Sequence, residues 1–236
     1  MSKTFLSAEW RRLILANYAV DSAILKKYLP AKTELDLWNN TCYVSLVGFM
    51  FQNTKVLGLK IPFHVNFEEV NLRFYVKHKS TQGEWRRGVV FIKEIVPKSA
   101  ITFVANNLYK EHYQTLEMSH RWESGKMLET EYAWLHNKRW NRMSVKTDKH
   151  AHEIADGSEA EFISEHYWGY TKNGAKTSEY EVRHPRWGVF DVKEYDIDVD
   201  FGAVYGDEFK ILSESQPKSI FLAEGSEISV HQDNAV

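Results

Sequence analysis

Polar side chains of different chemistry alternate along the stretch from Asn66 to His78. At the two-residue period of a β-strand, one face of this stretch carries Glu69, Asn71, Arg73 and Tyr75. A carboxylate can transfer a proton, a guanidinium can bind an anion through parallel N–H groups, and an amide and a phenol can orient a ligand. The stretch therefore has the groups needed to bind an organic acid and to move a proton on it.

The location of this polar face decides whether it can serve a ligand. The opposite face of the same strand is apolar and consists of Val70, Leu72, Phe74 and Val76. A solvated strand with a surface ion pair is one interpretation, but such a face usually carries Lys, Thr and Ser. We predict that the polar face is interior. Because Glu69 and Arg73 lie about 13 Å apart along a strand, we expect a network and not a lone ion pair.

Two later segments add candidate side chains. Glu165 and Tyr167 follow a short predicted helix, and His184 precedes Pro185, which restricts His184 to extended geometry and so fixes the direction of its ring. One interpretation places these side chains near the polar strand as an acid, a base or a ligand clamp. The alternative is a polar network that fixes the packing of strands in the core.

The histidines and lysines suggest chemistries that the sequence argues against. His150, His152 and Glu153 resemble a metal-ligand cluster, but they lie in a polar segment and no second cluster has matching spacing. We therefore predict no metal. Lys26 and Lys27 are adjacent, as in a Schiff-base pair, but they occupy a helix face that we expect to be solvated. Glycine-rich phosphate loops and known nucleophile motifs are absent, so we predict no cofactor.

Composition narrows the classes of partner. The chain has 236 residues with a net charge of −2, which gives no general attraction to nucleic acid or to anionic membranes. The single cysteine, Cys42, excludes an internal disulfide, and no apolar segment has the length of a signal peptide or a membrane span. We expect a cytoplasmic protein. An apolar edge strand would allow a homodimer, although no pattern requires one.

The order of predicted elements favours a single α+β domain with a mostly antiparallel sheet, because strands dominate and no βαβ alternation occurs. We assign residues 1–230 to this domain and 231–236 to a disordered tail. Short helices are predicted at 22–29, from residue 97 with an apolar stripe through Ile101, Val104, Ala105 and Leu108, and after Ser158, which forms a capping box with Glu161. The predicted strands are Arg11–Val20, Glu34–Trp38, Tyr43–Gln52, Asn66–His78, Arg87–Val96, His120–Trp122, Lys126–Leu135, Lys138–Lys146, His166–Tyr170, Tyr180–His184 and Val189–Tyr195.

Several segments together resemble the YqjF-like family of uncharacterised bacterial proteins. The most specific is Phe67-x-Glu69-x-Asn71-x-Arg73-x-Tyr75-Val76. The others occur in the order of the family and are Val20-Asp21-x-x-x-Leu25-x-x-x-Leu29-Pro30, Tyr43-Val44-x-Leu46-Val47-x-Phe49, Glu165-x-Tyr167 and His184-Pro185-x-Trp187. These segments extend over residues 10 to 225, nearly the whole chain.

The YqjF-like family resembles a branch of the acetoacetate-decarboxylase-like superfamily. The resemblance implies a cone-shaped antiparallel β-barrel with a flanking sheet, short helices and a central ligand cavity. True decarboxylases carry paired lysines after an Arg-Glu motif, whereas the corresponding region here has Asn106-Asn107 and no lysine pair. Lys110 is nearby, but the neighbouring carboxylate of Glu111 would keep its pKa high. Catalysis through a Schiff base is therefore not expected.

Two functions follow from these observations. In the first, the cavity is lined by Glu69, Asn71, Arg73, Tyr75, Glu165, Tyr167 and His184. It binds or transforms a small carboxylate or carbonyl compound, with Arg73 on the anion and Glu69 or His184 moving a proton. In the second, the polar strand is only a core network, and the protein acts as a non-catalytic structural or interaction module.

Overall fold

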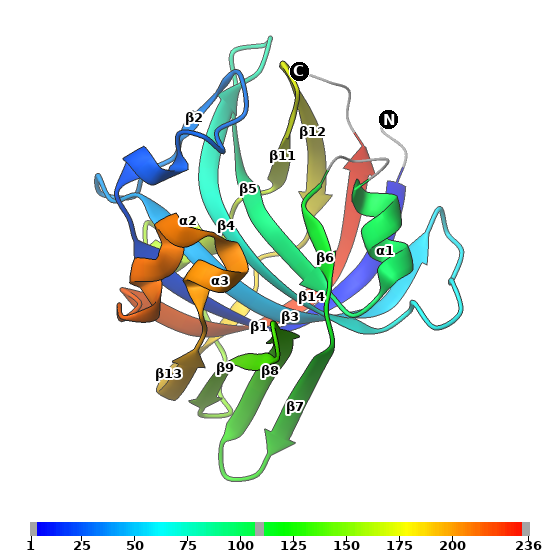
Figure 1. Cartoon of the computed structure of the whole chain (residues 1–236), viewed down its shortest axis with the longest axis vertical. Coiled ribbons are helices and arrows are strands. Elements are labelled where there is room, and N and C mark those ends of the chain that lie inside the picture. The colour runs from blue at the N-terminus through cyan, green and yellow to red at the C-terminus, as the bar shows by residue number, and fades with distance from the viewer. Residues whose placement is uncertain (1–3, 107–110, 233–236) are drawn as a thin grey trace.

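The computed structural model describes residues 4–106 and 111–232. Its elements are mostly antiparallel strands with a few short helices (Figure 1). The longer strands are β1 (Thr4–Ala19), β3 (Tyr43–Val56), β4 (Phe67–Lys79), β5 (Trp85–Val96), β7 (Met118–Ser124), β8 (Leu128–His136), β9 (Arg139–Thr147), β11 (Trp168–Asn173), β12 (Lys176–Arg183), β13 (Gly188–Asp198) and β14 (Ser219–Gln232). The short ones are β2 (Thr33–Leu35), β6 (Tyr113–Thr115) and β10 (His152–Glu153).

Seven of these strands close into a ring. Their order is β1-β3-β4-β5-β11-β12-β14, and the antiparallel pairing of β1 with β14 completes the circle. The pairing of β5 with β11 is parallel and short, joining Gly88 to Trp168 and Val89 to Gly169. Beyond β14 the sheet continues through β13, β9, β8 and β7, which form a separate arm below the ring in Figure 1.

Both faces of β4 are buried, and each face packs on a different part of the molecule. The apolar face, which includes Val70 and Leu72, joins the core that contains Tyr132 and Met143 of the arm. The arm approaches so closely that a Cβ atom on Gly48 of β3 would lie 2.8 Å from the Met143 sulfur. Strand alternation then turns the polar face of β4 into the ring. The predicted interior position of this face is confirmed by its burial.

The helices are short and cover parts of the ring. They are η1 (Ser22–Leu25), α1 (Ser99–Val104), α2 (Glu159–Ser164), α3 (Phe201–Tyr205) and η3 (Asp207–Ser213). At α2 the Ser158 hydroxyl accepts a hydrogen bond from the Glu161 backbone N–H at 3.2 Å, as the capping pattern predicts. The apolar stripe of α1 was expected to be buried. This expectation is wrong, because α1 has no buried residue. Leu108, the last member of that stripe, lies outside the described residues.

Other differences from the sequence concern the last third of the chain. The periodicity analysis missed α3, η3 and β14, although β14 pairs with three other strands. β14 extends through Gln232, so the expected boundary of the tail at residue 231 falls inside the strand. The polar segment that carries His150, His152 and Glu153 contains β10 and the buried side chain of Ile154. In the described parts of the chain, no helix is long and apolar enough to cross a membrane.

Candidate functional site

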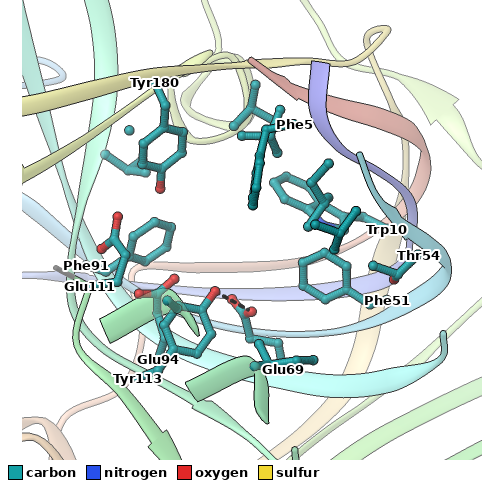
Figure 2. A pocket seen from close by; sticks show the side chains of 18 of the residues that line it. Phe5, Trp10, Phe51, Thr54, Glu69, Phe91, Glu94, Glu111, Tyr113 and Tyr180 are labelled. Carbon is teal, nitrogen blue, oxygen red and sulfur yellow. Dashed lines mark hydrogen bonds between the residues drawn. The ribbon is translucent and has the colours of Figure 1, made fainter. Parts of the chain in front are cut away.

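The interior of the ring holds a cavity of about 370 Å³. Figure 2 shows carboxyl and phenol groups on one side of it, with the ring of Phe91 among them, and the rings of Phe5, Trp10 and Phe51 on the other. The side chains of Glu69, Glu94, Glu111, Tyr113 and Tyr180 form the first group, and those of Phe5, Trp10 and Phe51 belong to the second. The cavity is thus divided into a polar wall and an aromatic wall.

Glu69 is the centre of a hydrogen-bond network on the polar wall. Its Oε1 accepts a hydrogen bond from Asn71 Nδ2 at 2.9 Å, and its Oε2 accepts one from the Tyr113 hydroxyl at 3.1 Å. The backbone of Tyr113 is held in turn by Asn106, whose amide side chain exchanges two hydrogen bonds of 2.8 Å with it. Burial raises the pKa of Glu69 to about 7 despite these two donors.

Two further carboxyl groups share the polar wall. Glu94 of β5 is 2% exposed and its Oε2 has no hydrogen-bond partner, while Glu111 accepts a hydrogen bond from the Thr171 hydroxyl at 2.6 Å. Burial raises the pKa of Glu111 to about 7. Burial, and then the charges of Glu111 and Glu69, hold the pKa of Glu94 well above its usual range. Glu94 therefore keeps its proton at neutral pH, whereas Glu69 and Glu111 are each partly protonated there, so the cluster can both donate and accept hydrogen bonds.

Tyr180 of β12 completes the polar wall. A Cβ atom on Gly169 of β11 would lie 2.1 Å from the Tyr180 ring, so only glycine at position 169 leaves room for this ring to point into the cavity. Burial, and then the charge of Glu111, raises the pKa of the Tyr180 phenol. The phenol therefore stays protonated and is a hydrogen-bond donor toward the cavity.

Arg73 lines the cavity without the partner that a buried cation usually has. Its residue is only 9% exposed, and its Nη2 donates one long hydrogen bond of 3.4 Å to the Ile163 carbonyl, next to the end of α2. Its Nε has no partner, and within the described residues no carboxylate forms an ion pair with its guanidinium. Glu69 and Arg73 thus face the same interior, but their hydrogen-bond partners lie in different directions. An unpaired buried guanidinium is costly and is suited to an anionic ligand.

His166 also lies in the cavity wall, on the short segment between α2 and β11. Its Nε2 lies 3.2 Å from Asp36 Oδ2, which also accepts a hydrogen bond of 2.6 Å from Arg87 Nε. Burial lowers the pKa of His166 to about 4. His166 is therefore neutral at pH 7, with Nε2–H donated to Asp36 and with Nδ1 unpartnered in its enclosed position.

Of the residues predicted from the sequence, Glu69, Arg73 and His184 line the cavity. The His184 ring stacks on Trp187, with the ring centroids 4.2 Å apart, and burial lowers the pKa of His184. Asn71 is one step removed, because its amide reaches the cavity only through Glu69.

Three predicted residues do not belong to the cavity wall. The Tyr75 hydroxyl lies 2.6 Å from the Ser45 hydroxyl, inside the core. Glu165 and Tyr167 hydrogen-bond to each other, and the Tyr167 ring lies 4.8 Å from the ring of His184. Their placement matches the alternative interpretation, a polar network that supports strand packing.

The sequence missed the larger part of the polar wall. Glu94, Glu111, Tyr113, Tyr180 and His166 were not chosen. Two of them could have been found from the sequence. Glu94 lies on the strand that follows the polar strand, and His166 lies between two residues that were chosen. Glu111 lies just before β6, where no local pattern specifies that its side chain turns inward.

The metal and lysine hypotheses concern residues away from this wall. His150, His152 and Glu153 are exposed, and His152 lies 3.0 Å from the Asp191 carboxylate. Across residues 4–106 and 111–232, no group of three or more metal-binding side chains occurs. Lys26 and Lys27 are exposed, and Lys27 pairs with Glu208 at 2.5 Å. No described lysine lines the cavity, and Lys110 lies outside the described residues.

The ring, its arm and the enclosed cavity define an acetoacetate-decarboxylase-like fold. Acetoacetate decarboxylase from Legionella pneumophila superposes with a TM-score of 0.67 at 11% identity, covering 100% of this chain and 88% of the other. The enduracididine biosynthesis enzyme MppR, solved with the condensation product of pyruvate and imidazole 4-carboxaldehyde, gives 0.67 at 11% identity, covering 100% and 90%. An acetoacetate-decarboxylase-like enzyme from Sphingomonas wittichii RW1 gives 0.66 at 10% identity, covering 99% and 93%. Identities this low establish the fold alone.

Within this fold class, the chain belongs to the DUF2071 family of uncharacterised conserved proteins, which it matches over residues 7–227. It is also 36% identical, over 75 residues, to the uncharacterised protein YqjF of Bacillus subtilis (strain 168). That match spans 31% of this chain and 31% of YqjF. The resemblance to YqjF-like proteins is therefore confirmed, and the likeness to acetoacetate-decarboxylase-like enzymes is confirmed for the fold.

Proposed function

We propose that the cavity binds a small organic acid that also carries a carbonyl group, and that Arg73 receives its carboxylate. The observation that carries this proposal is the buried guanidinium of Arg73, which has no ion-pair partner among the described residues and lies in the wall of the cavity. A buried cation without a partner destabilises a fold, so its presence is best explained by an anion that binds there. A carboxylate offers two oxygens in the geometry that a guanidinium prefers.

The protonated carboxyl groups would receive the carbonyl group of the ligand. Glu94 keeps its proton at neutral pH, and the phenol of Tyr180 is a donor on the same wall. Glu69, with a pKa of about 7, has the value suited to giving or taking a proton beside a carbonyl. The chemistry that fits these groups is proton transfer next to a carbonyl, without a Schiff base.

One further observation supports this proposal. One solved structure of MppR, which has the same fold, is described as a complex with pyruvate. The likeness to MppR is one of fold, so it supports the ligand class and specifies no residue.

The test is isothermal titration calorimetry at pH 7 with acetoacetate and pyruvate, on the wild-type protein and on Arg73→Met. We expect binding to the wild type and a loss of at least tenfold in affinity in the variant. Arg142→Met is the matched control, because Arg142 lies on the arm and pairs with Asp196 at 2.8 Å. Equal affinity in the wild type and Arg73→Met would exclude Arg73 as the anion site.

A further inference from the structure

The volume of the cavity gives information about its ligand that the polar wall does not give. At about 370 Å³, it has the volume of roughly twelve water molecules in the liquid, at about 30 Å³ each. It also falls in the size range of pockets that enclose drug-sized ligands. An acid of three or four carbons would leave most of this volume to water.

Water in that remaining volume would face the aromatic wall. The rings of Trp10 and Phe49 lie 5.2 Å apart, those of Trp10 and Phe51 lie 5.9 Å apart, and Phe51 stacks on Phe67 at 4.7 Å. With Phe5, Trp10, Phe51 and Phe67 all in the cavity wall, these contacts make a preformed apolar surface. Apolar surface of this kind gains free energy when it is covered by apolar groups of a ligand.

The apolar lining also reaches the outside of the molecule. Ile61, in the turn between β3 and β4, and Val104, at the end of α1, both line the cavity and are both exposed, at 44% and 39%. Ala105 lines the cavity next to Val104. An apolar chain that extends beyond the cavity would therefore meet these apolar side chains at the rim.

The two polar groups of β4 that face the cavity, the carboxyl group of Glu69 and the guanidinium of Arg73, are attached far apart along the strand. Four residues separate Glu69 from Arg73, which corresponds to about 13 Å of strand. Arg73 is hydrogen-bonded toward the end of α2, whereas Glu69 is hydrogen-bonded toward Tyr113 of β6. A three-carbon acid held by Arg73 leaves the carboxyl cluster without a partner, and a longer ligand can contact both.

We propose that the natural ligand is an elongated, amphipathic organic acid. Its carboxylate binds Arg73, its polar group contacts the carboxyl cluster, and an apolar chain or ring of several carbons covers the aromatic wall. This inference rests on the proposed function and extends it from small keto acids to acids with a substantial apolar body.

The test is a series of straight-chain acids that end in a methyl ketone, from acetoacetate to 7-oxooctanoate, titrated calorimetrically at pH 7; each added carbon lengthens the apolar body and moves the carbonyl group farther from the carboxylate. Each buried methylene contributes about 0.8 kcal/mol, so we expect the dissociation constant to fall about fourfold per added carbon until the cavity is full. Affinity that is flat or falls with chain length, with Arg73-dependent binding of acetoacetate retained, would overturn the inference and leave the proposed function standing. Absence of binding by every acid would overturn both.

Two variants test the walls separately. Phe5→Ala removes a ring from the aromatic wall and should weaken the binding of 7-oxooctanoate about tenfold while leaving that of acetoacetate nearly unchanged. Phe63→Ala is the matched control, because Phe63 is 87% exposed and does not line the cavity. Ala105→Phe narrows the cavity without removing a contact, and should weaken the longest acids more than the shortest. Equal effects of Phe5→Ala and Phe63→Ala on the long acids would contradict the role of the aromatic wall.

Discussion

Replacing Glu69 by Gln gives a direct test of the protonated carboxyl cluster. Glutamine has the shape of a protonated glutamic acid, with one carbonyl oxygen and one donor. Its carbonyl oxygen can accept from Asn71 Nδ2, and its amide can donate to the Tyr113 hydroxyl oxygen, so the network around position 69 is preserved. The variant therefore removes the ionisation of this carboxyl group while leaving its surroundings in place.

The expected effect depends on pH in a defined direction. In the unfolded chain the glutamate titrates near 4.5, and in the folded protein burial raises its pKa to about 7. Between these values the folded state binds more protons than the unfolded state, so the free energy of unfolding falls as pH rises. For one such group this loss is under about 1 kcal/mol at pH 5 and about 3 kcal/mol at pH 8. Glu69→Gln lacks this ionisation. Its free energy of unfolding should therefore rise, relative to that of the wild type, by roughly 2 kcal/mol between pH 5 and pH 8.

The assay is urea unfolding of the ligand-free proteins at pH 5 and pH 8, followed by tryptophan fluorescence. The control is Glu227→Gln, which changes an exposed glutamate on β14 that is not in the cavity wall. We expect Glu227→Gln to follow the wild type at both pH values and Glu69→Gln to exceed it only at pH 8. A stability difference between wild type and Glu69→Gln that is the same at both pH values would refute the assignment of a raised pKa to Glu69.

Three further predictions concern Arg73, the lysines and the histidine segment. Arg73→Leu should leave the stability of the ligand-free protein unchanged or raise it, because no ion-pair partner of Arg73 is left buried and unpaired by the change. A loss of about 3 kcal/mol in urea unfolding would show that Arg73 is part of the structural core. Borohydride reduction in the presence of acetoacetate should leave the intact mass unchanged, since no described lysine lines the cavity, and an adduct mapped to Lys110 or any other lysine would restore Schiff-base catalysis. Elemental analysis of untagged protein should find no stoichiometric transition metal, and one equivalent of zinc lost on mutation of His150 and His152 would contradict this.

The polar strand could be found from the sequence because its information is local. Two-residue alternation separates the faces of β4 without knowledge of any partner, and both faces prove to be buried. The same reasoning placed Tyr75 in the cavity, but the hydroxyl of Tyr75 meets Ser45 inside the core. Alternation identifies the side of the sheet on which a residue lies. It does not specify how far along the strand the packed core gives way to the cavity.

The carboxyl cluster could not be found in this way because its members come from separate elements. Glu94 follows Lys93 on β5, and such a charged pair is typical of a strand edge in water. Closure of the ring turns Glu94 inward, and this closure depends on the pairing of β1 with β14, more than 200 residues apart in sequence at Leu6 and Val230. Glu111 reaches the cavity from a turn and not from a strand. Periodicity carries no information about either arrangement.

The ligand-free protein keeps two kinds of buried group that do not neutralise each other. Arg73 and Glu69 lie on the same face of one strand, and a fold that paired them would bury their charges at a lower cost than two separate ones. Instead, Glu69 is held by Asn71 and Tyr113, and Arg73 remains open to the cavity. A fold selected for stability alone would have closed this gap or replaced both residues by apolar ones. The separation of Arg73 from Glu69 is therefore better explained by a ligand that contacts both. This explanation fails if Arg73→Leu and Glu69→Gln leave the affinity for every acid in the chain-length series unchanged.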